Sequence, residues 1–164
     1  MLLYLVRHGI AVDPADPKAP PDPDRPLTAE GVKKTRSAAL GLSALGVKPD
    51  ILITSPYLRA AQSAEIFAEA LEFPVEKIRA SDALKPGANP ADAIKEISRL
   101  RAKEVMCFGH APHLDNMISL LAGSRSPFTS LKKAGIACLE QTTSHGKWEL
   151  AWLLTPKTLR RLAD

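Results

Sequence analysis

The feature that most constrains the fold is the alternation of short apolar runs with longer stretches of helical periodicity. The apolar runs have strand length and fall at residues 2–6, 51–53, 77–80, 105–108, 136–140 and 148–154. Strands that alternate with helices pack as a mostly parallel sheet covered on both faces. We therefore expect an α/β fold, a three-layer sandwich with a mostly parallel mixed sheet, whose last two strands pair antiparallel or lie at the sheet edge.

Helix signals lie between these runs. The expected helices cover residues 28–46, 55–73, 89–100 and 112–122. Thr28 can cap the first of them, and Ser55 and Pro56 suit the N-cap and first positions of the second. A turn at residues 144–146 joins the last two strands.

Residues 13–26 form the one low-complexity stretch, in which Pro and Asp alternate. Each Pro removes a backbone donor and clashes with the preceding turn of a helix. We therefore expect a stiff, non-helical loop inside the domain. Long loops of this kind are often functional or mobile. A plain connector is the competing interpretation, and the sequence leaves both open.

Length and composition fit a single domain that spans residues 1–164. Hydrophobic residues make up 45% of the chain and charged residues 24%, both ordinary for a soluble globular protein. Aromatic residues make up only 5%, which argues against a nucleic-acid surface built on base stacking. No apolar run approaches the roughly 20 residues that a membrane span needs. We therefore expect neither nucleic acid nor a membrane as a partner.

Charge and cysteine content give weaker indications. The formal net charge of +4 is either solvated surface charge or a weak field that attracts anionic substrates, and net charge alone does not choose between them. Cys107 and Cys138 lie in apolar stretches without a CxxC motif. They are expected to be small buried side chains in a reduced, cytoplasmic protein.

Basic side chains follow three of the expected strands, at the point where each strand ends. Arg7 and His8 follow the first strand. Arg59 lies about one turn beyond the second, and His110 follows the strand at 105–108. Ligand sites in open α/β sheets form outside the carboxyl ends of the strands. We therefore expect these four side chains to meet in one crevice.

Two guanidinium groups and two imidazoles suit phosphoryl transfer. Arginine binds phosphate oxygens with paired hydrogen bonds and stays charged. A cation such as Arg59 in the first turn of a helix opposes the helix dipole unless an anion lies beside it. A neutral imidazole is a competent nucleophile at pH 7. The pattern therefore predicts a metal-independent phosphatase in which His8 becomes a transient phosphohistidine, while Arg7, Arg59 and His110 bind the phosphoryl group.

The spacing of His110, His113 and Asp115 could also indicate a metal site. Two nearby guanidinium groups would repel a dication, so no metal or other cofactor is expected. His113 and Asp115 are interpreted as helix-surface residues. His145 is given no role.

Three blocks of residues resemble the histidine phosphatase superfamily, whose fold is phosphoglycerate mutase-like. Residues 7–9 look like its RHG signature, and residues 55–63 look like its SPxxRAxQT block, with Ser63 in place of the usual Thr. Residues 109–110 look like its third block, and the resemblance covers about residues 2–155. It implies that the first His is phosphorylated and that two Arg and the second His bind the phosphoryl group.

Within the superfamily the chain looks most like the short SixA-type phosphohistidine phosphatases. Residues 25–28, Gly31 and residues 109–112 carry this likeness, together with the small size. It implies a phosphorylated protein as substrate, either a histidine-phosphotransfer domain or a phosphocarrier, with inorganic phosphate as product and a role in signal transduction. The chain has little room for a helical cap, so the site should be open and shallow.

Ester-cleaving relatives carry a Glu that residues 83–87 lack, and Asp82 is the nearest carboxylate. A labile P–N bond depends less on such an acid than an ester does.

Arg25 could reach the rim of the phosphate site, or it could be an ordinary loop residue. Alternative functions are a phosphatase of small phosphomonoesters or polyphosphate and a non-catalytic phosphate-binding module. A metal hydrolase is the alternative that the sequence favours least.

Overall fold

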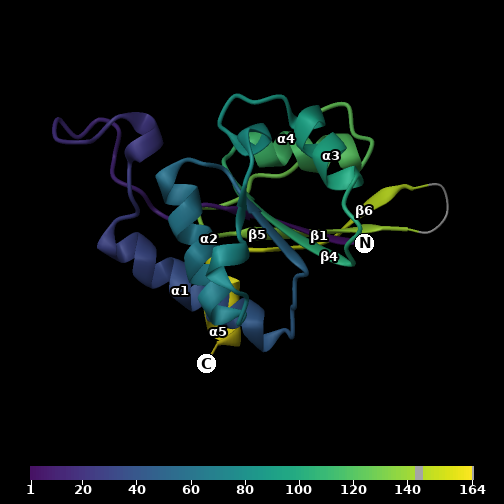
Figure 1. Cartoon of the computed structure of the whole chain (residues 1–164), viewed down its shortest axis with the longest axis horizontal. Helices are drawn as coiled ribbons and strands as arrows, with labels where there is room; N and C mark the ends of the chain where they lie inside the picture. The colour runs from purple at the N-terminus through teal and green to yellow at the C-terminus, as the bar shows by residue number, and fades with distance from the viewer. Residues whose placement is uncertain (143–145, 164) are drawn as a thin grey trace.

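The computed structural model describes residues 1–142 and 146–163, which contain one six-stranded sheet with helices on both faces (Figure 1). The strands lie in the order β3-β2-β4-β1-β5-β6. The first four are mutually parallel, and β5 and β6 are antiparallel to their neighbours. Their bounds are β1 Leu2–Arg7, β2 Ile51–Thr54, β3 Arg79–Ala80, β4 Glu104–Gly109, β5 Ile136–Gln141 and β6 Trp148–Leu154. The predicted mostly parallel mixed sheet is confirmed.

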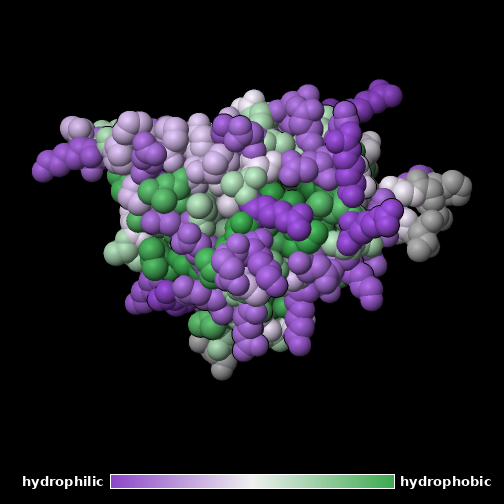
Figure 2. All heavy atoms as spheres, viewed as in Figure 1, coloured by the Kyte–Doolittle hydropathy of each residue, from purple (hydrophilic) through white to green (hydrophobic). Residues whose placement is uncertain are grey.

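The helices form two layers that enclose the sheet (Figure 1). Their bounds are α1 Ala29–Ala44, α2 Leu58–Ala70, α3 Pro90–Ser98, α4 His113–Leu121 and α5 Pro156–Leu162. Tyr4 and Val6 of β1 pack in a core with α1, α2 and α5, whereas Leu3 and Leu5 pack in a second core with α3 and α4. A strand buried on both faces reads as a continuous apolar run. Figure 2 shows hydrophobic atoms between the two helical layers and a mainly hydrophilic surface elsewhere on that face.

Two predicted helix starts are confirmed, and one is wrong. The Thr28 hydroxyl accepts a hydrogen bond from the Gly31 amide, as a cap of α1 should. The cap of α3 at Asn89 is also confirmed. Helix α2 does not start at Ser55: its N-cap is Tyr57. The Ser55 amide instead donates to the carbonyl of Phe108, which continues the pairing between β2 and β4.

Other differences are local. Residues 75–77 form a 3₁₀ turn, so β3 is shorter than the predicted strand. Helix α5 was not predicted, although the Thr155 hydroxyl caps it and Pro156 occupies its first turn. The last two strands pair antiparallel as expected. The predicted turn at 144–146 falls largely outside the described residues.

Residues 13–26 form the expected loop, with one short exception. Asp22–Asp24 make a single 3₁₀ turn, which the Pro-based prediction excluded, since Pro23 is tolerated within so short a helical turn. A bridge between Ala11 and Leu27 closes the base of the loop. The loop projects beyond α1 and α2 in Figure 1.

Two further expectations can be compared with the described residues. Cys107 and Cys138 are buried and unbonded, which confirms their interpretation as small core side chains. Among the described helices, none combines the length and apolar character that crossing a membrane requires.

Candidate active site

The ends of β1, β2 and β4 bring three of the four predicted side chains together. The rings of His8 and His110 lie 5.1 Å apart between centroids. Arg59 Nε lies 3.4 Å from His8 Nε2. The His8 amide donates to the carbonyl of Gly109 at 3.0 Å, so pairing between the parallel strands fixes the two histidine positions. All three side chains are buried.

His8 is held in the tautomer that a nucleophile needs. Its Nδ1 lies 2.7 Å from the Gly9 carbonyl oxygen, and because a carbonyl only accepts, Nδ1 carries the proton. The lone pair therefore lies on Nε2, which faces Arg59. Burial, aided by the charges of Arg59 and Arg7, lowers the pKa of His8 to about 4. The ring is thus neutral and unprotonated at Nε2 near pH 7.

His110 contributes a second neutral ring. Its Nε2 lies 2.9 Å from the Ser55 hydroxyl oxygen, and the edge of Tyr57 packs against it. Burial, followed by the neighbouring His8, lowers the pKa of His110 to about 2. Its Nδ1 is buried and has no hydrogen-bond partner in the described part of the chain. An unpaired buried nitrogen of this kind fits an oxygen atom of a bound anion.

Arg59 is 4% exposed and lies between the histidines and the Pro-rich loop. Its Nη1 donates to the main-chain oxygen of Asp22 at 2.7 Å, and its Nη2 lies 3.4 Å from a carboxylate oxygen of Asp22. The guanidinium also lies over the ring of Tyr57. An acidic group therefore already occupies one side of the predicted phosphate-binding arginine.

Asp22 was not singled out from the sequence. Partial burial acts to raise its pKa, but hydrogen bonds from Arg25 and the charge of Arg59 outweigh burial and lower the pKa of Asp22. The carboxylate therefore stays ionised. The sequence offers one general signal, a Pro-rich loop with several carboxylates that begins soon after the predicted nucleophile, but that signal does not distinguish Asp22 from the other carboxylates of the loop.

Arg25 contacts Asp22, which in turn contacts Arg59. Its Nε and Nη2 donate to a carboxylate oxygen of Asp22 at 2.8 and 2.6 Å, and its Nη1 donates to the carbonyl of Val12. Arg25 thus fastens the loop and holds the carboxylate that touches Arg59. Direct contact of Arg25 with a phosphate rim stays a prediction.

Arg7 is anchored to the segment that precedes β5. Its Nη1 donates to the carbonyl of Leu131 at 2.8 Å. Within the described residues its buried Nε has no hydrogen-bond partner, and burial lowers the pKa of Arg7. A buried guanidinium nitrogen without a partner is suited to an anionic ligand.

The surface interpretation of His113 and Asp115 is wrong. Both residues lie in the first turn of α4 and are buried, at 3% and 5% exposure. The Asp115 carboxylate accepts from the Leu131 amide at 3.0 Å and from the Thr129 hydroxyl at 2.7 Å. It therefore holds the segment whose carbonyl at Leu131 binds Arg7. Asp115 is a positioning residue.

Ser63 joins the first two sequence blocks. Its hydroxyl oxygen accepts from the Gly9 amide at 3.0 Å and donates to the Arg59 carbonyl at 2.7 Å. A Cβ on Gly9 would lie 2.2 Å from the Thr35 hydroxyl oxygen. Residue 9 therefore has no space for a side chain, and the serine that replaces the usual threonine keeps the hydroxyl that joins the two blocks.

Other carboxylates and possible metal ligands lie elsewhere. Asp82 is exposed and forms an ion pair with Lys85. Within residues 1–142 and 146–163, no three His, Cys, Asp or Glu side chains cluster as a metal site would require. His145 lies outside the described residues.

Comparison with known proteins gives a consistent result. A model of the histidine phosphatase superfamily (branch 1) matches residues 3–86. An uncharacterized protein of Picosynechococcus sp. is 36% identical over 167 residues, covering 97% of this chain and 99% of that protein. The phosphohistidine phosphatase SixA of Escherichia coli is 26% identical over 161 residues, 92% and 94% of the two chains. The structure of the protein histidine phosphatase SixA complexed with tungstate matches with a TM-score of 0.84 at 24% identity, over 97% of this chain and 99% of that chain.

These matches confirm the resemblance and the phosphoglycerate mutase-like fold. The segment matched by the family model contains His8 and Arg59, whereas His110 lies beyond it. The two relatives extend the similarity to 97% and 92% of this chain.

Proposed function

The chain is a phosphatase that belongs to branch 1 of the histidine phosphatase superfamily, and we propose that its substrate is a phosphohistidine side chain on another protein. The reaction needs a nucleophile that is neutral at pH 7 and unprotonated at one ring nitrogen. His8 has both properties, because Nδ1 is bound to the Gly9 carbonyl and burial holds the pKa at about 4.

The first step transfers the phosphoryl group to the enzyme. His8 Nε2 attacks phosphorus, the P–N bond to the substrate imidazole breaks, and the departing nitrogen takes a proton from water. Positive charge that develops on His8 is spread toward Nδ1, whose proton is already hydrogen-bonded to Gly9. The substrate protein leaves with a neutral histidine.

The second step regenerates the enzyme. A water molecule attacks phosphorus, the bond from phosphorus to His8 Nε2 breaks, and inorganic phosphate leaves. Arg59 and His110 stabilise charge on the equatorial oxygens in both steps, and the unpaired Nε of Arg7 supplies a further donor. The substrate phosphate displaces the Asp22 carboxylate from Arg59, because both anions use the same guanidinium.

The state of Asp22 favours a phosphoramidate over a phosphate ester. An alkoxide leaving group needs a proton donor. Asp22 is the carboxylate that contacts Arg59, and its lowered pKa keeps it ionised, so it is poorly suited to give up a proton. The imidazole of phosphohistidine is a better leaving group and takes its proton readily from water. This observation, together with the similarity to the E. coli phosphohistidine phosphatase, supports the choice of substrate.

Phosphate release from four substrates tests the proposal. They are a phosphorylated histidine-phosphotransfer domain, phosphoserine, an aryl phosphate and tripolyphosphate. We expect the histidine-phosphotransfer domain to have the highest kcat/KM by at least about tenfold. Equal or faster hydrolysis of an ester or of tripolyphosphate would refute this choice of substrate, and binding without release would indicate a non-catalytic module. A cytoplasmic location and a role in signal transduction belong to the same proposal.

A further inference from the structure

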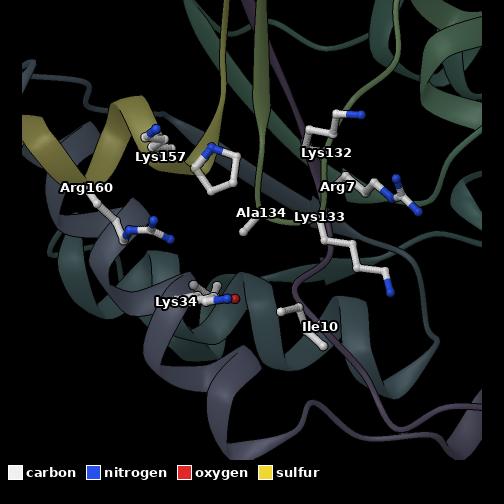
Figure 3. Close-up of a pocket in the computed structure, with 10 residues that line it drawn as sticks. Arg7, Ile10, Lys34, Lys132, Lys133, Ala134, Lys157 and Arg160 are labelled. Carbon is white, nitrogen blue, oxygen red and sulfur yellow. The ribbon is translucent and has the colours of Figure 1, made fainter.

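A cavity of about 450 Å³ lies between α1, α5 and the segment that precedes β5 (Figure 3). Its volume is that of a small-molecule site. The apolar lining comes from Ile10, Ala134 and Pro156. We call this space the basic cavity, because the remaining lining residues are cations and one threonine: Arg7, Lys34, Thr35, Lys132, Lys133, Lys157 and Arg160.

The cations come from four separate parts of the chain. In Figure 3, Lys157 and Arg160 of α5 lie on one side of the cavity, and Lys132 and Lys133 lie on the other, with their amino groups directed away from α5. No aspartate or glutamate belongs to the lining. Of the lining cations, Lys34 alone forms an ion pair in the described part of the chain, with Glu30. Like charges gathered without counter-charges repel one another, so an anion in the cavity would lower their energy.

A buried hydroxyl adds a second observation. Thr35 is fully buried and also lines the cavity. Its hydroxyl oxygen lies beside Gly9 and has no hydrogen-bond partner among residues 1–142 and 146–163. Buried polar atoms without partners are rare in folded proteins, and a bound ligand or water is their usual explanation.

We propose that the basic cavity binds an oligophosphate, a chain of two or three phosphate groups that is either free or carried by a nucleoside. Cations on opposite walls of one cavity match several neighbouring negative groups better than they match a single phosphate. The cavity is partly open to solvent and has the size for a compact ligand, and its apolar side chains offer a surface for the base of a nucleotide. The cavity is distinct from the site of the proposed reaction, because His8, Arg59 and His110 do not line it; Arg7 alone belongs to both.

The two sites share a short stretch of backbone. The Ala134 amide donates to the carbonyl oxygens of Arg7 at 2.9 Å and His8 at 3.1 Å. The neighbouring Lys133 lines the cavity. A ligand held by Lys132 and Lys133 therefore lies one residue away from the backbone that positions the nucleophile.

Calorimetric titration with tripolyphosphate tests the proposal in the presence of saturating orthovanadate, which occupies the phosphoryl site and prevents hydrolysis. We expect one bound tripolyphosphate per chain. The double variant Lys157→Ala/Arg160→Ala should weaken binding by at least about tenfold, because two charge-assisted contacts are lost. The matched control is Lys77→Ala/Arg79→Ala, which removes the same charge from exposed residues beside β3, at the far edge of the sheet.

Two further titrations, with ATP and with an acidic peptide, identify the class of ligand. Equal affinity for tripolyphosphate and ATP would support free oligophosphate recognition, and tighter binding of ATP would support a nucleotide site. Binding that both double variants weaken equally, or tighter binding of an acidic peptide than of either phosphate compound, would overturn the proposal. Phosphohistidine hydrolysis by Lys157→Ala/Arg160→Ala should equal that of the wild type, so a failed binding test leaves the proposed function standing.

Discussion

The strand-end histidines and the Pro-rich loop approach Arg59 from opposite sides, and they differ in how firmly they are held. His8 and His110 are 7% and 3% exposed and are fixed by backbone pairing between parallel strands. Asp22 has a side chain that is 50% exposed and lies on a single 3₁₀ turn. The two histidines are therefore suited to hold the reacting atoms in place, whereas the contact of Asp22 with Arg59 is one that a substrate can displace.

The histidines and Asp22 also differ in their charge at pH 7. The two histidines are neutral because burial penalises their protonated forms. Asp22 is ionised because two arginines outweigh its partial burial. Changes to the buried side should therefore affect turnover and the pH dependence of stability, whereas changes to the loop side should mainly affect anion binding.

The largest effect is expected from His8→Ala, which removes the proposed nucleophile. Turnover should fall by at least about 10³-fold, since the covalent intermediate cannot form. The fold should persist, because the anchoring contact of this residue is its backbone amide to Gly109. Phosphate release and circular dichroism measure the two properties. A variant that kept most of its activity would show that the attacking group lies elsewhere.

Regular packing explains why the strand-end side could be predicted from the sequence. The run before Arg7 and the run before Gly109 are buried on both faces, so they stand out in the sequence as short continuous apolar runs of strand length. Once strands are recognised, the rule for their carboxyl ends places His8 and His110 together. Helix α5 had comparable signals in Thr155 and Pro156 and was overlooked.

The loop side could not be predicted, because its contacts depend on where an irregular segment folds back. Nothing in the alternation of Pro and Asp shows which carboxylate reaches Arg59. The error at Asp115 has a similar origin, since its partners at 129–131 lie in a segment without periodicity. The error at Ser55 arose because local capping rules ignore a tertiary partner, here His110.

A smaller effect is expected when stability is measured against pH. Unfolded histidines titrate near pH 6.5, whereas His8 and His110 have folded pKa values of about 4 and about 2. Below pH 6.5 the unfolded state therefore binds more protons, and stability falls as pH drops. Between pH 7 and pH 5 each histidine should lower the free energy of unfolding by about 2 kcal/mol.

Urea denaturation at pH 7, 6 and 5 measures this loss. The His8→Asn variant should show a shallower decline than the wild type, because one of the three buried imidazole rings is gone. Asp22 cannot produce the same slope, since its pKa is lowered from a value that already lies below this range. Identical declines in the two proteins would mean that His8 is not held neutral by the fold.

The smallest effect is expected from Asp22→Asn, and its sign separates two views of the loop. The carboxylate competes with phosphate for Arg59, so removing its charge should tighten vanadate binding by about two- to fivefold, as expected for a half-exposed ion pair. The main-chain bond from Arg59 to residue 22 survives the substitution, which keeps the turn in place. Asp24→Asn, an exposed change in the same turn, is the matched control and should leave vanadate affinity unchanged. If Asp22→Asn instead weakens vanadate binding, the carboxylate orients Arg59 for the phosphate and does not compete with it.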